Sequence, residues 1–500
     1  MIYPTFMTQA LEFVKLTRPD EVVKVLPSKD TRSLSFRMNI DGLLRVLESG
    51  YREKTRKSLE IYRRAEKVMV KGGSHTLRLW QPYPFFIAGA AGAEVLDADG
   101  NSYIDYWQGH YANILGHNPE VIREELGEQI EKGALQTGFE AQPQIELAEV
   151  LLLQFGTKGY KVRFTTSGTL ATMYSVMLAK AHTGRACVLK VGGGWHGASP
   201  YLLKGVKYHA GVGFEGGESA GVSDEILKET LITRFDDGDD LARVLKEKGK
   251  DIACFILEPF IGVGGFLPAS REYLELARHL TEEYGVILIF DEIISGFRFC
   301  PAGVQTLYGV RPDLAAFGKL IGGGHAVSAV VGKDEIMEEC EAPGPGRMKV
   351  LFEGGTFSAH SEYMTAGLIM LKHLIGRAEE IYPQLGRAGE RLRRGIEAAF
   401  ADEGIEARCT GYGNDVVKQS SLFMVNFPLA KTGLRSPENI WDPAVCSVRL
   451  REEALKLALL SRGVHVVHGG GAVSTAHSDD VIGRTIDAYR EVAKTFKKYM

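Results

Sequence analysis

The sequence predicts an α/β protein with a mainly parallel central sheet and a second, smaller α+β domain. First, 500 residues exceed the usual size of one hydrophobic core, so two packed domains are expected. Second, hydrophobic residues make up 45% of the chain and charged residues 24%, which is typical of a globular protein rather than a disordered or fibrous one. Third, short β-rich runs alternate with helical stretches between residues 160 and 335.

The first 70 residues are rich in charge and show helical spacing. Leu43, Leu44, Leu47 and Tyr51 would lie on one face of a helix. We therefore expect amphipathic helices packed on the outside of the protein, in a segment that carries no catalytic signature.

A hairpin is predicted from Ala88 to Trp107. Apolar and polar residues nearly alternate there around Asp99 and Gly100, a pair that favours a tight turn. A small antiparallel sheet is expected in this part of the chain.

Residues 160–335 are predicted to form the main sheet. Helical patterns alternate with five short β-rich runs: KVRFTT, ACVLKV, IACFILEP, GVILIFDE and SAVVG. Such runs are typical of strands buried on both faces of a mainly parallel sheet, which binds its ligand at the carboxyl ends of the strands. From about residue 365 onward, helical patterns surround short strands such as SLFMVNF, which predicts the second domain.

The net charge and the lack of recognisable targeting signals favour a cytoplasmic protein that acts on small molecules. The net charge of -4 gives no general attraction to nucleic acid or to acidic lipid. The N-terminus lacks the features of a secretory signal, and no uncharged stretch approaches the length of a membrane span. The six cysteines lack the paired spacing of a zinc site or a disulfide framework.

A phosphate site is indicated at Thr166, Ser167, Gly168 and Thr169. These residues directly follow the run KVRFT and begin a helical pattern. Free backbone N–H groups at a helix N-terminus, together with hydroxyl donors, suit a phosphate. The alternative is a simple helix cap.

Three glycines follow the predicted strand at residues 186–191 and precede Trp195 and His196. A triple glycine permits backbone geometry that is closed to other residues. Trp195 would then lie at the carboxyl end of a strand, where it could stack on a flat heteroaromatic ring. The alternative is a core tryptophan beside a loop.

The apolar run GVILIF ends in Asp291 and Glu292. Carboxylates at the end of a buried strand are unfavourable unless a partner pairs with them. A protonated pyridine nitrogen would be such a partner for Asp291, and the ring would then act as an electron sink. Ile293 could pack on the ring face opposite Trp195. The alternatives for Asp291 are a helix cap and a metal ligand, although no nearby acidic or histidine cluster favours a metal.

Lys319 lies between two apolar runs, flanked by Gly318 and by glycines at 322–324. Such surroundings favour a partly buried amine with a lowered pKa, which suits Schiff-base chemistry. The alternative is an ordinary solvated lysine. Taken in order, a phosphate-binding helix N-terminus, an aromatic residue that could stack on a ring, a carboxylate at a strand end and a reactive lysine indicate a site for pyridoxal 5′-phosphate (PLP).

In these motifs the chain resembles the class III aminotransferases, and within them the glutamate-1-semialdehyde aminomutase-like branch. The resemblance runs from about Val70 to the C-terminus. It rests on SGT (167–169), WHG (195–197), EP (258–259), DEIISGFR (291–298), GKLIGGG (318–324) and GGTFSAH (354–360).

The resemblance implies PLP fold type I, which has a large domain with a mainly parallel seven-stranded sheet flanked by helices. A small α+β domain is built from both chain ends. The implied segments are an N-terminal helical extension (1–70), the first part of the small domain (71–110), the large PLP-binding domain (111–365) and the rest of the small domain (366–500). It also implies a homodimer with shared active sites.

The resemblance also implies roles for single residues. Lys319 would form the Schiff base with PLP and later move a proton on the substrate. Asp291 would pair with the pyridine nitrogen. Ser167, Gly168 and Thr169 would hold the phosphate.

Five further residues are expected to contact the cofactor. Trp195 and Ile293 would sandwich the ring, and Thr356 would reach the phosphate of the neighbouring subunit's cofactor. His196 belongs to the same cofactor-binding set. Glu258 resembles the family's strand-end glutamate near the phenolic side of the ring, with a purely structural role as the alternative.

Two residues are expected to bind the substrate. Arg78 matches an arginine that grips a substrate carboxylate, a task that suits a planar guanidinium, with a surface salt bridge as the alternative. His110 stands where the branch places another aromatic residue. Trp80, Trp107 and Tyr111 would leave room for a bulky or apolar side chain.

The chain departs from the aminomutase pattern near its C-terminus. That pattern has a glutamate shortly before a Ser-Thr-Ala-His segment, and here Gly469 or a neighbour stands in its place. A mutase must keep its intermediate bound, so we expect instead an aminotransferase that moves an amino group from an α- or β-amino acid to an oxo acid by a ping-pong mechanism. The alternative is a PLP-dependent isomerase, either an aminomutase or a racemase. A PLP-fold protein without turnover is disfavoured because every cofactor-contact position holds a competent residue.

Overall fold

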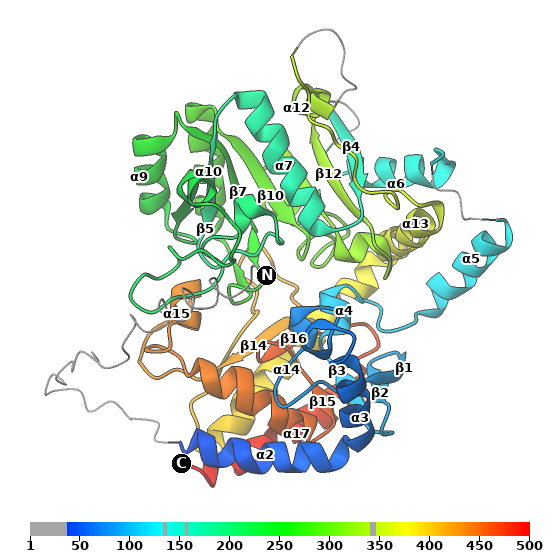
Figure 1. Ribbon diagram of the computed structural model, residues 1–500, viewed down its shortest axis with the longest axis vertical. Helices are drawn as coiled ribbons and strands as arrows, with labels where there is room; N and C mark the ends of the chain where they lie inside the picture. Colours follow the sequence, from blue (N-terminus) through cyan, green and yellow to red (C-terminus); the bar gives the residue numbers. More distant parts are fainter. Residues whose placement is uncertain (1–37, 134–137, 156–158, 341–346) are drawn as a thin grey trace, which may run out of the picture. The chain divides into compact units, whose positions relative to one another are not determined.

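The computed structural model describes residues 38–133, 138–155, 159–340 and 347–500, and the largest sheet in these residues has seven strands (Figure 1). Their order is β4-β12-β11-β10-β7-β5-β6. The strands are β4 (Tyr160–Thr165), β5 (Cys187–Val191), β6 (Thr230–Thr233), β7 (Ile252–Leu257), β10 (Ile287–Glu292), β11 (Leu314–Phe317) and β12 (Ser328–Lys333).

All strands of this sheet run in one direction except β12, which is antiparallel to both of its neighbours. The predicted, mainly parallel sheet is therefore confirmed. Two of its strands, β6 and β11, lie outside the five runs that the sequence pattern singled out.

Helices cover both faces of the seven-stranded sheet. Because side chains alternate along a strand, successive residues of β7 enter different cores. Cys254 and Ile256 pack with residues of α7 (Gly168–Thr183). Phe255 and Leu257 pack with α9 (Gly238–Lys248) and α10 (Arg271–Tyr284), which lie on the other face (Figure 1).

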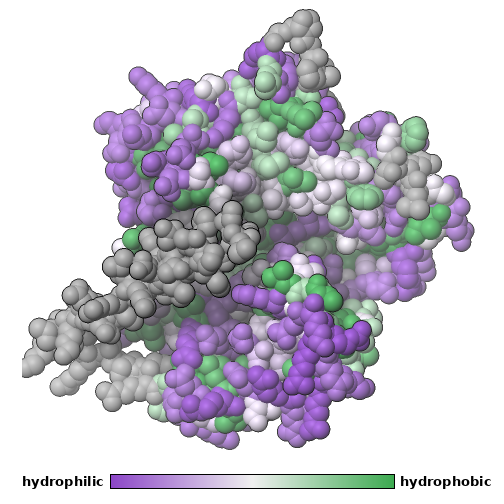
Figure 2. Space-filling model, viewed as in Figure 1, coloured by the Kyte–Doolittle hydropathy of each residue, from purple (hydrophilic) through white to green (hydrophobic). Residues whose placement is uncertain are grey.

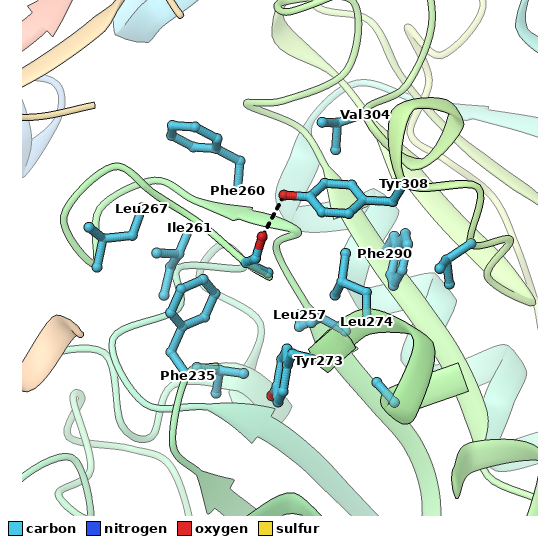
Figure 3. Packing of buried hydrophobic residues seen from close by; sticks show 14 of the residues in the cluster. Phe235, Leu257, Phe260, Ile261, Leu267, Tyr273, Leu274, Phe290, Val304 and Tyr308 are labelled. Carbon is cyan, nitrogen blue, oxygen red and sulfur yellow. Dashed lines mark hydrogen bonds between the residues drawn. The ribbon is translucent and has the colours of Figure 1, made fainter. Parts of the chain in front are cut away.

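The core beneath α9 and α10 is rich in aromatic side chains (Figure 3). Phe260, Phe290, Tyr273 and Tyr308 are almost fully buried. The Tyr308 hydroxyl donates a hydrogen bond to the Ala269 carbonyl at 2.7 Å, which satisfies its only polar group. This buried layer packs beneath the strand ends described below.

A second sheet joins the two ends of the chain. Its order is β1 (Ile87–Ala91), β2 (Glu94–Asp97), β3 (Ser102–Asp105) and β15 (Val464–His465). The predicted hairpin is confirmed, since β2 and β3 are antiparallel around Asp99 and Gly100, and Gly100 has φ +91°. β15 pairs parallel with β3, so residues near position 465 lie beside the hairpin.

The amphipathic helices expected near the N-terminus are α2 (Ile40–Lys54) and α3 (Arg56–Ala65). Leu43, Leu44, Leu47 and Tyr51 are buried, as predicted, and α2 packs against α16 (Lys456–Leu460). The part of this prediction that concerns residues 1–37 lies outside the described residues.

A third sheet lies in the C-terminal part of the chain. It contains β13 (Arg408–Thr410), β14 (Leu422–Asn426) and β16 (Gly470–Ala472), and β14 is the predicted strand SLFMVNF. Three long helices surround it: α13 (Ser361–Gly376), α14 (Ala378–Ala401) and α17 (Asp479–Lys497). These elements form the α+β region that the sequence predicts after residue 365.

The remaining elements are short or connect the sheets. The helices are α4 (Gln108–Tyr111), α5 (Glu120–Glu131), α6 (Gln142–Leu152), α8 (Asp224–Glu229), α11 (Gln305–Tyr308), α12 (Asp334–Met337) and α15 (Pro437–Trp441). The 3₁₀ turns are η1 (Val70–Gly72), η2 (Thr76–Arg78), η3 (Pro200–Leu202), η4 (Lys319–Gly322) and η5 (Glu338–Cys340), and η6 (Leu450–Leu455) is a π-helix. β8 (Phe260–Ile261) and β9 (Leu267–Pro268) form a two-stranded ribbon.

The surface carries mostly hydrophilic residues on the face that Figure 2 shows, with apolar residues in smaller patches. Among the described residues, no helix is long and apolar enough to cross a membrane. Nor does this part of the chain contain a group of three or more His, Cys, Asp or Glu side chains arranged to hold a metal ion. All six cysteines are free thiols.

Candidate active site

The carboxyl ends of β7, β10 and β11 meet at one edge of the seven-stranded sheet. The register pairs Phe290 with Leu257, so Asp291 and Glu258 come next on neighbouring strands. On the other side Asp291 lies opposite Ala316, and Lys319 follows the end of β11 by two residues. Three titratable residues singled out in separate sequence motifs are thereby brought to one place.

Asp291 is buried, and two donors hold its carboxylate. The Nδ1 atom of His196 lies 2.8 Å from one oxygen, and the backbone N–H of Ile293 donates to the other at 3.0 Å. Burial lowers the pKa of His196, although Asp291 acts in the opposite direction. A neutral imidazole beside a carboxylate carries its proton on the facing nitrogen, so His196 orients the carboxylate from behind.

Glu258 joins the loop after β5 to the end of its own strand. Its two oxygens accept hydrogen bonds from the backbone N–H groups of Trp195 at 3.1 Å and Gly262 at 3.0 Å. Burial, followed by the charge of Asp291, raises the pKa of Glu258 to about 8, while Lys319 acts in the opposite direction. The residue therefore has both an architectural and an electrostatic effect on this edge.

Lys319 has the features of an amine held ready for covalent chemistry. Its backbone has φ +49°, and its side chain is half-buried. Among the described residues, its Nζ has no hydrogen-bond or ion-pair partner, whereas most buried polar groups are satisfied. Burial lowers its pKa to about 8 against the pull of Asp291 and Glu258, so a larger share of the amine is neutral and nucleophilic near pH 7.

The first turn of α7 lies directly against this edge. Ser167 is the N-cap residue, and its hydroxyl accepts the N–H of Leu170 at 3.3 Å. A Cβ atom at Gly168 would come within 3.1 Å of Ile293, and one at Gly318 within 2.9 Å of the same side chain. A side chain at Gly318 would therefore displace its neighbours, and one at Gly168 would push Ile293 by a few tenths of an ångström, so the two glycines let the helix, Ile293 and the lysine segment approach closely.

The Trp195 loop is attached to the same helix. Gly197 has φ +82°, and a Cβ atom there would lie 2.5 Å from the Thr169 hydroxyl oxygen. The His196 carbonyl accepts the Thr172 hydroxyl at 2.6 Å. These contacts place the half-buried Trp195, the Thr169 hydroxyl and the helix N-terminus in one small region.

Arg78 and His110 line one cavity of about 430 Å³, together with Trp80 and Trp107. Arg78 is exposed, and its Nη1 donates to the Ser74 hydroxyl at 3.1 Å. Tyr111, the third aromatic residue expected near a bulky substrate, is instead buried.

His110 lies in a left-handed turn. Each residue of α4 has positive φ: Gln108 (46°), Gly109 (62°), His110 (60°) and Tyr111 (69°). Asp105 holds the start of this turn, because its carboxylate accepts the Gln108 N–H at 2.9 Å. At the end of the turn, the guanidinium of Arg298 donates to the Tyr111 carbonyl. Left-handed backbone costs free energy for residues other than glycine, so these bonds fix a conformation that the chain would not adopt alone.

The left-handed turn packs against η4, which begins with Lys319. Burial lowers the pKa of His110 to about 4, and the charges of His75, Arg78 and Lys319 act in the same direction. His110 is therefore neutral at physiological pH, between the exposed guanidinium and the segment of the unpartnered amine.

Thr356 lies apart from Lys319 in sequence and is exposed. It lines a second cavity, of about 680 Å³, with Phe139 and Gln144. A Cβ atom at the adjoining Gly355 would be 3.4 Å from the Thr166 hydroxyl oxygen, which places this loop near the end of β4.

Gly469 cannot be exchanged simply for the glutamate of the aminomutase pattern. It has φ +70°, and a Cβ atom there would lie 2.3 Å from Arg451. A neighbouring carboxylate, Glu452, comes from the π-helix η6 and lies 2.9 Å from Nδ1 of His468. Burial alone would raise the pKa of Glu452, but His468 and Arg451 outweigh it and lower the pKa to about 2.

Two residues of this region were not identified from the sequence. Lys190 is fully buried in β5, and Arg298 is buried behind the left-handed turn. The sequence does contain a signal for Lys190, because a lysine inside an otherwise apolar strand needs a specific partner. Arg298 has a weaker signal, since it ends the DEIISGFR motif but, among the residues that the structure describes, donates hydrogen bonds only to backbone carbonyls.

The family model for class-III aminotransferases matches residues 78–413. A glutamate-1-semialdehyde 2,1-aminomutase from Methanothermobacter thermautotrophicus is 36% identical over 444 residues, which cover 88% of this chain and 100% of that protein. The crystal structure of an omega-transaminase from Sphaerobacter thermophilus has 30% identity and a TM-score of 0.77, covering 88% of this chain and 97% of that one. The structure of a transaminase with PLP bound has 27% identity and a TM-score of 0.76, and the match covers 89% of this chain and 98% of that one.

The fold is that of a PLP-dependent enzyme of fold type I, with helices on both faces of a mixed sheet. The chain belongs to the class III aminotransferase family. Its cofactor is PLP, and the residues at the sheet edge fit this group: an unpartnered amine, a buried carboxylate fixed from behind and a helix N-terminus free of bulky side chains. The expectation of an aminotransferase is supported only as far as the family, because the similar curated relatives are named as aminomutases.

Proposed function

We propose that this chain uses PLP to move the amino group of a small amino acid held through its carboxylate. One observation carries the proposal: Lys319, whose Nζ has no partner among the described residues, follows β11 at the same sheet edge as the oriented carboxylate of Asp291, and the charge of Asp291 acts on its pKa. When bound, PLP supplies a ring that withdraws electrons from the carbon bearing the amino group. Lys319 would hold the cofactor covalently, and Asp291 would keep the pyridine nitrogen protonated.

The first turn of α7 would bind the phosphate. Ser167 and Thr169 offer hydroxyls, and Gly168 leaves its backbone N–H open to an anion at the positive end of the helix. Trp195 and Ile293 would cover the two ring faces, because both are held against this turn.

Three further residues would support the cofactor. His196 would act through Asp291, whose orientation it fixes, and Glu258 would lie near the phenolic side of the ring. Thr356 would reach the phosphate of a second subunit, which requires a homodimer with shared active sites. The exposed loop of Thr356 and the cavity beside it support this assignment.

Lys319 would also move the proton during the reaction, because burial lowers its pKa to about 8, so the amine can both give up and accept a proton near neutral pH. Arg78 would bind the substrate carboxylate, since its exposed guanidinium has no acidic partner among the described residues. His110, Trp80 and Trp107 would contact the rest of the substrate within the 430 Å³ cavity.

The first candidate reaction moves the amino group within one molecule, as an aminomutase does. It is supported by the 36% identity to a glutamate-1-semialdehyde 2,1-aminomutase across the whole of that relative. Glu452 adds support, since it places a carboxylate next to the position where the aminomutase pattern has one.

The second candidate is transfer from an amino acid to an oxo acid. Gly469 favours it, because this position has no carboxylate and no space for a larger side chain. The 30% identity to an omega-transaminase of the same fold points in the same direction.

Turnover without an amino acceptor separates the two reactions. An aminomutase converts many substrate molecules per site with no acceptor present, whereas a transaminase stops after about one and resumes when an oxo acid is added. A panel of α- and β-amino acids, including amino aldehydes, would be screened by the change in cofactor absorbance. No absorbance change with any carboxylate-bearing amine, in protein that binds PLP, would refute the proposal.

A further inference from the structure

Lys190 is a fully buried lysine near the carboxyl end of β5, one strand away from the candidate active site. In the sheet register it lies opposite Ile256 of β7. Alternate residues of a strand share a face, so Lys190 is on the side of Ile256 and, two residues further on, of Glu258. This is the face that α7 covers.

The amine of Lys190 holds the Trp195 loop. Its Nζ donates to the carbonyl of Gly194 at 3.0 Å and to the carbonyl of Lys204 at 2.8 Å. Gly194 directly precedes Trp195, whose own N–H donates to Glu258. The Lys190 amine and the Glu258 carboxyl group therefore bind the same peptide unit of the loop from two sides.

Lys190 forms no salt bridge with a carboxylate in the described residues, although a buried ammonium group is costly without compensation. Burial lowers its pKa to about 7, while the charges of Glu258 and then Glu218 act in the opposite direction. The positive charge of Lys190 also helps to lower the pKa of His196, the residue that orients Asp291. The charge of Lys190 thus interacts electrostatically with Glu258 and His196 without a hydrogen bond to either side chain.

We propose that Lys190 is a positioning residue of the PLP site, an inference that rests on the proposed function. Its two hydrogen bonds clamp the carbonyl of Gly194 to that of Lys204, and its protonated form is the counter-charge of ionised Glu258 when Lys319 carries the cofactor. The clamp keeps Trp195 in place, and the counter-charge lowers the cost of negative charge on Glu258.

Two variants separate the clamp from the charge. Lys190→Met removes both the donors and the charge, while Lys190→Gln keeps donors without the charge. Lys180→Met is the matched control, because Lys180 is a partly buried lysine of the same region that pairs with Glu229 at 3.0 Å and does not contact the loop.

The first measurement is hydrogen–deuterium exchange of the backbone amides of residues 192–197 in protein without cofactor. We expect exchange at least about 10-fold faster in Lys190→Met than in wild type, and nearly unchanged exchange in Lys190→Gln and in the control. This measurement does not depend on turnover, so it tests the clamp even if the proposed reaction is wrong.

The second measurement is the pH midpoint for ionisation of Glu258, read from its carboxyl band in infrared difference spectra. Loss of the positive charge makes ionisation of Glu258 harder, so the midpoint should move to higher pH in both Lys190 variants and stay in place in the control. Glu258, Glu218, His196, Asp291 and Lys319 are the titratable groups that face this region. If Lys190→Met does not fold, Lys190→Gln still reports the charge effect.

Wild-type loop exchange in a folded Lys190→Met protein would overturn the clamp. An unshifted midpoint in Lys190→Gln would overturn the counter-charge. A wild-type protein that fails to bind PLP would refute the proposed function instead, and the two failures are therefore distinguishable.

Discussion

At the scale of single residues, the candidate active site combines two acids and an amine that few other environments would bring together. Asp291 and Glu258 end adjacent buried strands, and Lys319 follows the next strand. Burial disfavours the charged forms of Glu258 and Lys319, so it raises the pKa of Glu258 and lowers the pKa of Lys319. Shifts of this kind cluster at reactive sites, and here they affect the residue proposed to hold the cofactor.

Lys319→Ala should abolish covalent attachment of PLP. The described residues include no other half-buried amine at the carboxyl ends of β10 and β11 that could replace it. After borohydride reduction, mass spectrometry of the wild-type protein should find the cofactor on the peptide with Lys319 and should find none in the variant.

Lys180→Ala provides the comparison for this experiment, because it removes a partly buried lysine that is engaged with Glu229. Its labelling should equal that of wild type. Cofactor trapped on a different lysine in wild-type protein would show that the site has been assigned to the wrong residue.

His110 should make the protein less stable in mild acid. Its pKa in the folded chain is about 4, below its ordinary value of 6.5, so the unfolded chain binds a proton first as the pH falls. The stabilising effect of a neutral His110 is complete above pH 6.5 and is lost as the pH falls towards 4. Between pH 7 and pH 4.5, wild type should lose roughly 1–2 kcal/mol more unfolding free energy than His110→Asn, allowing for partial exposure.

Urea denaturation at the two pH values measures this difference, and asparagine suits the left-handed backbone of position 110. His279→Asn alters an exposed histidine and should follow the wild-type curve. Equal pH dependence of wild type and His110→Asn would mean that His110 is not neutral in the folded protein.

At the scale of elements, the junction between the Trp195 loop and α7 depends on glycine. Gly197→Ala would force a Cβ atom to 2.6 Å from the Thr169 backbone at a positive φ. We expect a loss of about 2 kcal/mol or more in unfolding free energy, with weaker PLP binding, because the loop must move away from the phosphate site.

Gly184→Ala is a control for backbone strain alone. This residue caps the C-terminus of α7 with φ +68°, but a Cβ atom there would meet open space. Gly184→Ala should lower the unfolding free energy by about 1 kcal/mol and leave the affinity for PLP unchanged. Equal effects of the two substitutions on PLP affinity would contradict the close-contact argument.

Much of this architecture could be predicted from the sequence, because strand composition and turn residues are local signals. The hairpin around Asp99 and Gly100 and the helix from Ile40 are examples. β6 and β11 were missed, since each has four residues and neither belongs to a hairpin with a tight Asp-Gly turn such as the one that marks β2 and β3. The direction of β12 is set by its partners rather than by its own sequence. The left-handed turn that presents His110 was also missed, because distant bonds from Asp105 and Arg298 impose it.

At the scale of the whole molecule, we propose the division into the large domain (111–365) and a small domain from residues 71–110 and 366–500. The parallel pairing of β15 with β3 supports a shared small domain, since it joins these two segments in one sheet. The fold class was predictable because ordered motifs mark one family. Substrate choice was not, because it depends on cavity shape.

A homodimer is expected to form through the region around Thr356. Several exposed apolar side chains lie on this loop and on the segments from α5 to the end of α6: Ile130, Phe139, Ile145, Leu153, Leu351 and Phe357. Phe139 lines the same cavity as Thr356. The double variant Phe139→Asp/Phe357→Asp should shift the protein from dimer to monomer in sedimentation-equilibrium experiments, since exposed apolar surface of this kind favours association.

Val46→Asp alters an equally exposed apolar residue on α2 and should leave the mass unchanged. A monomeric wild-type protein that is fully active would disprove the shared site.

The strand order has a consequence for synthesis. β4 pairs only with β12 among the described strands, although residues 160–165 leave the ribosome long before residues 328–333. The first turn of α7, which follows β4 and would bind the phosphate, therefore lacks its neighbouring strand until most of the sheet has been translated. PLP would then bind late in synthesis, and a truncated nascent chain that ends before residue 328 should be unable to retain PLP.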